Sequence, residues 1–466
     1  MTALETWELR AEFARRLSAM YGREVPAYNT LVEVSTEVNE AYAAKHGADA
    51  ERLGSIARVT AERHGAIRVG SPKEMAQVAR IFAAFGMYPV GLYDLRDASS
   101  SSVPVVSTAF RPIDGAELAK NPFRVFTSML AAADPRFFDQ ELRAELDAFI
   151  GARQLFGEEL LTLADKVAAG GGLAADDAAR LLELATAAFE LSGDPVDYEW
   201  YKKLEAVSAV ASDIGGVSTT HINHLTPRVL DIDELYKRME ARGISMIDEI
   251  QGPPRWDGPD LLLRQTSFRA LGENRVFRYA DGSTSEGELR VRFGEVEARG
   301  MALTVAGRDL YDRMVAESDA RLAVAPAGTT RVEVAAGVWA ENLPRTEKEL
   351  ALQGLAFFTY RLDDAALAGA SLAGTASLSD LVEAGIAVPE PIVYEDFLPR
   401  SAAGIFQSNL TEEGSKDEAQ VGTSYDIHRM SEIVGFEVHD PNDLYQRQQD
   451  ASIAALAHRL NITLSH

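Results

Sequence analysis

The sequence predicts an α+β protein: a mixed body of strands and helices that carries a helical insertion. Three observations predict this fold class. Apolar residues recur at helical spacing near both ends of the chain, strand-like runs fill two stretches between them, and residues 135–210 are rich in Ala, Leu and Glu with apolar residues three and four apart. No full repeat, low-complexity tail or long linker divides the 466 residues, so we expect one unit.

The N-terminal part begins with helices and continues with strands. Residues 5–46 have apolar positions at helical spacing, and Pro26 is expected to separate two helices. Ser71 is expected to cap another helix, which has Pro72 at its first position. Strands are expected at 67–69, 87–92 and 103–110, with a serine-rich turn at 98–102.

The rest of the chain mixes both kinds of element. Three glycines at 170–172 break the helical insertion, and a helix is expected at 234–241 after Asp231. Asp281 and Gly282 predict a hairpin turn. Strands are expected at 217–225, 261–268, 275–279, 287–298 and 302–305, a mixed region at 346–390, and an amphipathic helix at 441–462.

Composition excludes several classes of protein. The chain has no cysteine, which excludes disulfides, iron–sulfur clusters and thiol nucleophiles, so a metal must be held by His, Asp, Glu or backbone oxygen. The net charge of −25 argues against nucleic acid and anionic membrane as partners. Without an apolar run of about eighteen residues or a signal-peptide pattern, a cytoplasmic location is expected. The sequence does not fix the oligomeric state.

Three polar segments, far apart in the chain, together predict a metal site. They are 62–68 with His64, 221–228 with His221 and His224, and 293–297 with Glu295 and Glu297. Two histidines and one carboxylate can occupy one face of an Fe(II) ion and leave the opposite face open for O2 and a bidentate substrate. The pattern therefore predicts an iron enzyme that uses oxygen.

Spacing alone leaves the individual ligands open. The residues around His221 and His224 favour a strand, in which side chains three apart point to opposite faces, so only one of the two is expected to bind metal. The alternative is that both histidines are structural. Glu295 and Glu297 share a strand face, and either one of them points inward or both are solvated. Phe293 on the same face would supply an apolar wall.

Arg68 is a candidate for binding an anionic substrate. Gly65, directly after His64, allows close backbone approach. An arginine four residues after the histidine can make a bidentate contact to a carboxylate, although spacing alone favours an ordinary salt bridge to one of the 71 acidic residues. Three further segments have the mixed composition of a ligand pocket or of a strand end: 107–111, 264–268 and 394–406. The sequence has no common nucleotide, serine-hydrolase or zincin motif.

Seven stretches, taken in order, resemble a family long labelled a domain of unknown function and now associated with 2-oxoadipate dioxygenase/decarboxylase. They are ERHGAIRVG (62–70), STAFR (107–111), NPFRVFTS (121–128), HINHLTPR (221–228), LLRQTSF (262–268), FGEVEARG (293–300) and YEDFLPRSAAGIFQSNL (394–410). The metal site of this family resembles that of vicinal-oxygen-chelate dioxygenases, in which paired βαβββ-like units form an open, strongly curved sheet around the metal. We therefore expect a vicinal-oxygen-chelate-like core within one catalytic unit, 1–466, with residues 135–210 as a helical insertion.

The resemblance also implies roles for individual residues. It makes His64, His224 and Glu295 the Fe(II) ligands and places Arg68 on a substrate carboxylate. It brings the segment 399–401 to the substrate as well. Arginine at position 400 departs from the family pattern, so either the backbone of Arg400 makes the contact or its side chain alters which acid fits.

The family reaction converts 2-oxoadipate, a small 2-oxo dicarboxylic acid, with O2 and Fe(II) into (R)-2-hydroxyglutarate and CO2, a step in lysine breakdown. The resemblance implies this activity and these partners for the chain. Two other functions remain open: a metal-dependent isomerase or lyase of the same architecture, and a non-catalytic protein that binds a metabolite. Dependence on O2 and turnover of the ligand would separate the three.

Overall fold

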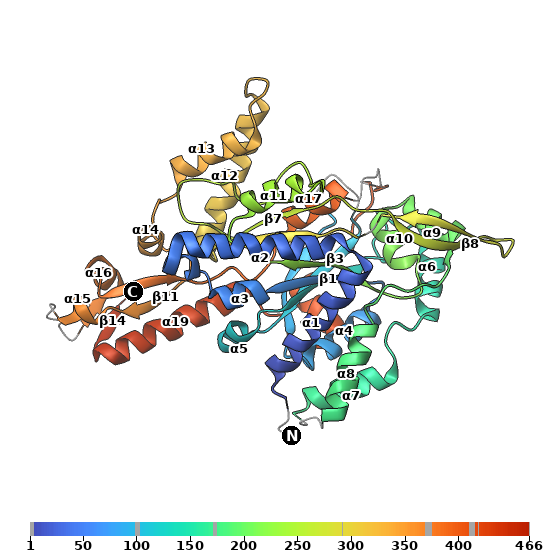
Figure 1. The fold of residues 1–466 in the computed structure, drawn as a ribbon, viewed down its shortest axis with the longest axis horizontal. Coiled ribbons are helices and arrows are strands. Elements are labelled where there is room, and N and C mark those ends of the chain that lie inside the picture. The colour runs from blue at the N-terminus through green and yellow to red at the C-terminus, as the bar shows by residue number, and fades with distance from the viewer. Residues whose placement is uncertain are drawn as a thin grey trace.

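A five-stranded sheet in the order β2-β3-β4-β1-β6 lies at the centre of the structure, a computed structural model (Figure 1). Its strands are β1 (Arg63–Val69), β2 (Tyr88–Asp94), β3 (Val105–Arg111), β4 (Arg124–Leu130) and β6 (Ile222–Pro227). β1 runs parallel to β4 and antiparallel to β6. The structure describes residues 4–97, 103–170, 175–290, 292–368, 375–409, 415–417 and 419–465, so the turn expected at 98–102 lies outside the described residues.

Two βαβββ units meet in this sheet. The elements that complete them are α4 (Pro72–Ala83), α11 (Ile232–Ala241), β7 (Leu263–Ser267) and β10 (Glu295–Arg299). In the first unit the chain runs β1-α4-β2-β3-β4, and β4 returns to pair with β1. In the second unit the chain runs from β6 to α11 and then to β7 and β10. The segment between α11 and β7 is bridged to Gln265 of β7 through Gln251, and to Phe268, directly after β7, through Met246. β10 returns beside β6 through a parallel bridge between Arg228 and Glu297.

The pairing of β1 with β6 joins the two units into one curved surface. This arrangement confirms the predicted α+β fold with a vicinal-oxygen-chelate-like core. A hairpin of β8 (Glu273–Arg278) and β9 (Thr284–Leu289) is inserted between β7 and β10 and turns at Gly282, whose φ is 84°. The hairpin turn predicted there is confirmed, and the single strand expected at 287–298 is instead the end of β9 and all but the last residue of β10.

The two faces of the central sheet differ in polarity because side chains alternate along each strand. On one face, Ile67 and Val69 of β1 join the main hydrophobic core with residues of α4 and of the N-terminal helices. On the other face the same strand carries His64, Ala66 and Arg68. The sheet thus presents an apolar face to the core and a polar face on which a site can be built.

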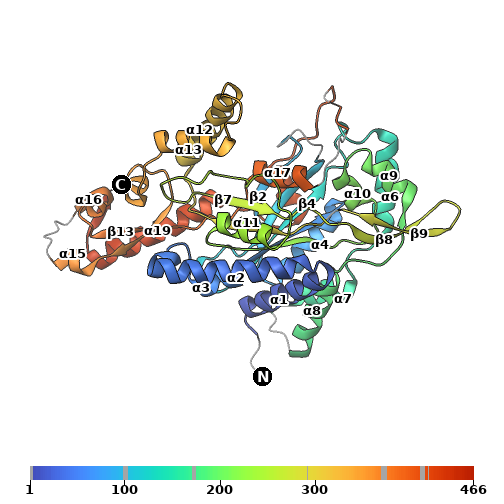
Figure 2. The ribbon, with the colours of Figure 1, turned by 45° about the horizontal axis from the view of Figure 1, so that its top comes forward.

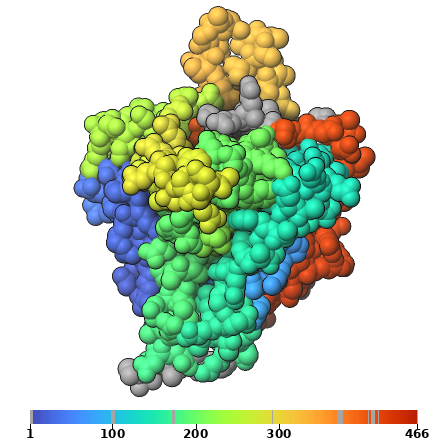
Figure 3. All heavy atoms as spheres, turned by 90° about the vertical axis from the view of Figure 1, so that its right-hand side faces the viewer, coloured from blue at the N-terminus to red at the C-terminus, as the bar shows by residue number. Residues whose placement is uncertain are grey.

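The N-terminal helices confirm the local predictions. α1 (Thr6–Glu24) ends and α2 (Ala27–His46) begins on either side of Pro26, and Ser71 caps α4 by accepting from the backbone N–H of Glu74. The remaining elements before β6 include η1 (Gly47–Glu51), α3 (Ile56–Ala61), α5 (Gly115–Lys120), α6 (Gln140–Ala152), α7 (Glu158–Ala168), α8 (Ala175–Ala187), β5 (Val196–Asp197), α9 (Tyr198–Glu205) and α10 (Ala209–Gly215). The helices from α6 to α10 cover much of one side of the molecule, in teal and green in Figure 3.

The C-terminal part adds a helical arm and a small outer layer. α12 (Val305–Ala323) and α13 (Arg331–Asn342) pack together and project from the body (Figures 1 and 2). The other elements are α14 (Glu347–Leu352), β11 (Phe358–Leu362), α15 (Asp364–Ala368), β12 (Thr375–Ser377), α16 (Leu378–Glu383), β13 (Ala387–Pro391), α17 (Pro399–Asn409), α18 (Ile427–Val434), α19 (Pro441–Leu460) and β14 (Thr463–Ser465). α19 confirms the predicted C-terminal helix.

The strand expected at 302–305 is wrong. Met301 and Leu303 form only isolated bridges, and the side chain of Thr304 accepts from the backbone N–H of Gly307, which makes it the cap of α12. A short apolar run before a threonine cap therefore has the pattern of a strand while belonging to a helix start. Across the described part of the chain, no helix is both long and apolar enough to cross a membrane.

Candidate metal centre

Three buried side chains from both βαβββ units converge on the polar face of the sheet. His64 comes from β1, His224 from β6 and Glu295 from the first position of β10, and one potential ligand atom from each lies within 4.8 Å of the others. The strand register explains the convergence. His224 lies opposite Ala66, two residues from His64, so both imidazoles project from the same face of the β1/β6 pair.

Both histidines turn the same ring nitrogen toward Glu295. Nε2 of His64 is 3.5 Å from Oε1 of the carboxylate, and Nε2 of His224 is 3.5 Å from Oε2. Each Nδ1 faces a different oxygen: that of His64 is in ion-pair contact with Oε2 of Glu297 at 2.8 Å, and that of His224 is hydrogen-bonded to Oγ1 of Thr226 at 3.0 Å. Partners at Nδ1 fix the ring orientation and direct Nε2 at the centre, which is how metal-binding histidines are usually held.

The two neighbouring glutamates have opposite electrostatic surroundings. Arg299 donates to both oxygens of Glu297, at 2.7 and 2.9 Å, and Arg124 approaches it at 3.4 Å. Burial raises the pKa of Glu297, but Arg299 and His64 outweigh burial and lower this pKa to about 2. Among the described residues Glu295 has no arginine or lysine within ion-pair distance, and burial raises its pKa.

A buried carboxylate without a fixed cation is costly unless a cation joins it. Glu295 is therefore the carboxylate that a metal ion would compensate, whereas the charge of Glu297 is already balanced by arginine. The sequence left open whether both glutamates are solvated. In the structure both are buried. Gln265 of β7 donates from Nε2 to Oε1 of Glu295 and holds the carboxylate from the side.

Burial and the nearby charges also shift the pKa values of the two histidines. Burial lowers the pKa of His224 well below its ordinary value, and the neighbouring His64 and Arg68 lower it further, so its imidazole is neutral and its lone pair is available. Burial also lowers the pKa of His64, but Glu297 and Glu295 outweigh burial and raise it. The negative potential that favours a proton on His64 would equally favour a metal cation at Nε2.

Aromatic rings close the site on two sides. The ring of Phe397 is 5.0 Å from that of His64, and the ring of Phe293 stacks on His224 at 5.6 Å with an interplanar angle of 24°. The apolar wall expected from Phe293 is therefore present. Phe126 of β4 packs against Phe397 at 4.9 Å. These rings keep bulk water away from the polar centre.

Behind Glu297 lies a buried network of charges. Arg124 donates to Oε1 of Glu62 at 2.8 Å, and Arg228 donates to Oε2 of the same carboxylate at 3.0 Å. Arg124 also donates to Glu395. Because these groups are buried and paired, they hold Arg124, and through it Glu297, in a fixed position.

Arg68 lies on the same face of β1 as His64 and is buried. Its Nη1 donates to Oδ2 of Asp213 on α10, so the salt bridge that spacing favoured is present. His221, the other candidate histidine, lies away from the three converging residues. Its Nε2 is 3.5 Å from Asp213 and 3.2 Å from Nδ2 of Asn223.

Arg400 does not point at the three converging residues. Its side chain is 60% exposed and donates to Asp319 of α12 at 2.7 Å, whereas the next residue, Ser401, is buried. Successive helical residues differ in direction by about 100°, so α17 turns position 400 outward and position 401 inward. A substrate contact through the backbone of Arg400 stays a prediction.

Sequence reasoning gave no role to several polar residues that hold the site, and Thr226 and Asp213 are two of them. Thr226 lies two residues after His224 on the same strand face, and this alternation could have identified it. Asp213 is 145 residues from its partner Arg68, and no local pattern identifies it.

Comparison with known proteins gives one family. Residues 13–409 match the family model described as 2-oxoadipate dioxygenase/decarboxylase. A Mycobacterium bovis protein of that name is 55% identical over 442 residues, covering 95% of this chain and 96% of the relative. An Escherichia coli protein of that name is 38% identical, covering 96% and 97%. The crystal structure of a Pseudomonas putida hydroxyglutarate synthase in complex with 2-oxoadipate has a TM-score of 0.83 at 38% identity, covering 99% of both chains. The chain belongs to the 2-oxoadipate dioxygenase/decarboxylase family.

Proposed function

We propose that this protein is an Fe(II)-dependent dioxygenase that converts 2-oxoadipate and O2 into (R)-2-hydroxyglutarate and CO2 in lysine catabolism. The observation that carries the proposal is the convergence of two Nε2 atoms on a buried carboxylate without an arginine or lysine partner among the described residues. Membership of the family supports the substrate, because the relatives are named for 2-oxoadipate and a P. putida hydroxyglutarate synthase is solved with it.

The residues fit Fe(II) as the metal. Two imidazoles from His64 and His224 and one carboxylate from Glu295 form the donor set that non-haem iron oxygenases use, and it leaves coordination positions open. The described part of the chain offers no thiolate, since the sequence contains no cysteine, so sites based on soft sulfur ligands are excluded. When bound, the iron would accept the 2-oxo acid as a bidentate ligand and activate O2.

The protein's own residues would bind and orient the substrate. Arg68, which lies buried on the strand that carries His64, would bind a carboxylate of the dianionic acid and so set which carbon faces the metal. The rings of Phe293 and Phe397 would keep water from the reacting atoms. Glu297 and Thr226 would hold the two imidazoles by their Nδ1 atoms throughout.

The overall reaction balances without another reductant. The substrate loses one carbon as CO2, and both atoms of O2 end in the products, so no external 2-oxo acid is consumed. We further propose that residues 1–466 act as one catalytic unit and that 135–210 is an insertion within it. The contact with Arg68 made by Asp213, on the helix α10 that begins at the end of this region, supports the single unit. The cytoplasmic location stays a prediction.

Oxygen consumption tests the proposal. The protein is stripped of metal, Fe(II) is restored without air, and O2 uptake is followed with and without 2-oxoadipate, with Zn(II) as the control metal. We expect uptake that needs both Fe(II) and 2-oxoadipate, with one 2-hydroxyglutarate and one CO2 formed for each O2. Turnover in the absence of O2 would instead indicate an isomerase or lyase, and binding without turnover would indicate a metabolite-binding protein.

A further inference from the structure

Asp213 forms a salt bridge with Arg68 and has no role in the proposed reaction as described so far. It comes from α10, where Ser208 caps the helix by accepting from the backbone N–H of Ala211 at 3.1 Å. Its carboxylate is buried and accepts from Nη1 of Arg68 through Oδ2. Nδ2 of Asn223 donates to the same oxygen at 3.1 Å.

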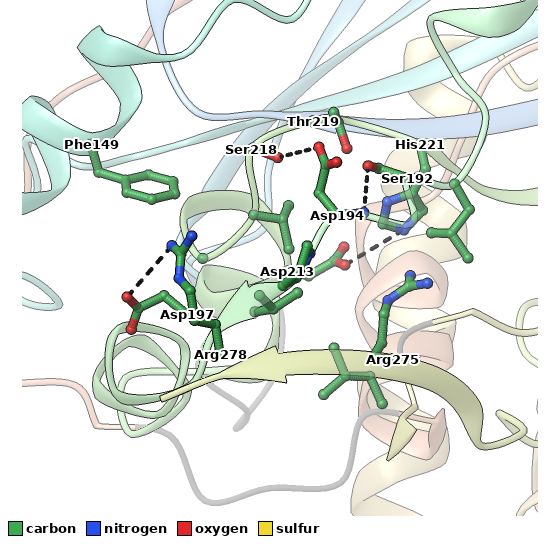
Figure 4. A pocket seen from close by; sticks show the side chains of 16 residues that line it. Phe149, Ser192, Asp194, Asp197, Asp213, Ser218, Thr219, His221, Arg275 and Arg278 are labelled. Atoms are coloured by element: carbon green, nitrogen blue, oxygen red, sulfur yellow. Dashed lines mark hydrogen bonds and ion pairs between the residues drawn. The ribbon is translucent and has the colours of Figure 1, made fainter. Parts of the chain in front are cut away.

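The other side of the Asp213 carboxylate faces His221. Nε2 of His221 is 3.5 Å from Oδ1, and Figure 4 shows the carboxylate pointing toward this ring at the edge of a small cavity. The cavity has a volume of about 90 Å³ and is also lined by Arg275. Burial lowers the pKa of His221 to about 3, so this ring is neutral. Burial raises the pKa of Asp213, but the charge and hydrogen bond of Arg68 and the hydrogen bond of Asn223 lower it, so Asp213 is charged.

The backbone around Arg68 is held from the same direction. Oγ1 of Thr220 donates to the carbonyl oxygen of Arg68 at 2.7 Å, and Thr220 directly precedes His221. Asn223 reaches both Asp213 and His221, the latter at 3.2 Å. The segment before β6 therefore fixes the main chain of Arg68, and α10 fixes its guanidinium.

A guanidinium carries five N–H donors and can pair carboxylates along more than one edge. A free arginine side chain loses rotamer entropy on binding, and a partner that holds it beforehand removes part of that cost. Asp213 also balances the buried charge of Arg68 when substrate is absent.

We propose that Asp213 is a positioning residue that holds the Arg68 guanidinium in the orientation needed to receive a carboxylate of the substrate. The inference rests on the proposed function. Asp213 would act only through Arg68 and would contact neither the substrate nor the metal ligands. Its loss would leave the iron site intact and let the 2-oxo acid bind in more than one orientation.

The test is a double-mutant cycle of Asp213→Asn and Arg68→Ala with kcat, KM and the ratio of 2-hydroxyglutarate formed to O2 consumed as readouts. In the otherwise native protein, Asp213→Asn is expected to lower kcat/KM by about tenfold or more, since a misplaced reactant can cost about 100-fold, and to lower the product ratio. In the Arg68→Ala background the same substitution is expected to change neither quantity.

Anaerobic Mn(II) affinity provides a readout separate from activity, and it is expected to be unchanged by Asp213→Asn. The matched control is Asp165→Asn, which breaks an exposed aspartate–arginine pair with Arg80 far from the site and should leave kcat/KM unchanged. Asp213→Ser is the second variant if the asparagine variant does not fold, because the adjacent cavity gives room for water.

Equal losses in both backgrounds, or an unchanged kcat/KM in Asp213→Asn, would overturn the inference. So would a loss of Mn(II) affinity equal to the loss of kcat/KM, which would mean that Asp213 supports the whole site. Failure of the proposed function is a different result, because the unsubstituted protein would then consume no O2 with 2-oxoadipate.

Discussion

Glu295 and Glu297 are neighbours on one strand face, but we expect their substitution by Gln to affect different properties. Glu297→Gln should mainly lower the free energy of unfolding, and Glu295→Gln should mainly abolish metal binding. The carboxylate of Glu297 is fully buried between Arg299, Arg124 and His64. Removing its charge leaves buried cations unpaired, which costs about 3–5 kcal/mol of the free energy of unfolding. Among the described residues Glu295 has no arginine or lysine within ion-pair distance, so removing its charge from the metal-free protein should change that free energy by about 1 kcal/mol or less.

Metal binding should show the reverse order. Glu295→Gln removes a proposed ligand, and Mn(II) binding is expected to be lost. Glu297→Gln leaves the proposed ligands in place but removes the charge beside His64 Nδ1, and such outer substitutions typically lower metal affinity by about 10- to 100-fold.

Two measurements check this crossed pattern. Urea unfolding with a chelator present gives the stability of the metal-free protein, and anaerobic calorimetric titration with Mn(II) gives the affinity. If Glu297→Gln abolished binding while Glu295→Gln bound normally, the ligand assignment would be reversed. Equal destabilisation by both substitutions would refute the electrostatic distinction between the two glutamates.

Three further predictions concern the surroundings of the site. Thr226→Val removes the Nδ1 partner of His224 and should lower anaerobic Mn(II) affinity by about tenfold without loss of folding, as followed by calorimetry and circular dichroism. Burial raises the pKa of Glu62, but the surrounding arginines outweigh burial and lower it, so Glu62 stabilises the fold above its ordinary pKa and this stability is lost as the pH falls. Urea unfolding between about pH 5 and pH 3 should therefore show a smaller loss of stability in Glu62→Gln than in the unsubstituted protein. Arg400→Ala should change kcat/KM by about twofold or less, because the side chain is exposed and points to α12; a larger change would mean that it reaches the substrate.

Local signals predicted the fold well where one residue decides the structure. Pro26 separates two helices, Ser71 caps α4 and Gly282 supplies the positive φ of a hairpin turn, each as expected from the sequence. The strand expected at 302–305 failed because an apolar run does not show whether a threonine after it caps a helix.

The site could be predicted only in part. Residue types identified the segments, but spacing could not choose between His221 and His224. Spacing shows that the two side chains point to opposite faces of a strand, but it does not show which face meets Glu295. The choice between Glu295 and Glu297 depends on arginines that only the fold brings near. Both choices depend on contacts between residues far apart in the sequence. The resemblance to a family indicated them, and physical reasoning from the sequence could not.

The pairing of β1 with β6 joins the two βαβββ units and explains why the site needs both of them. β1 supplies His64, while β6 and β10 of the second unit supply His224 and Glu295, so the distance between β1 and β6 sets the geometry of the centre. Gly65 lies opposite Leu225 in this pair, and a Cβ at this position would lie 2.9 Å from Ile222 Cδ1 and 3.3 Å from Leu225 Cδ2 on the facing strand. The close approach expected of this glycine is thus an approach to side chains of the second unit, and those of Ile222 and Leu225 would have to shift to admit a larger residue.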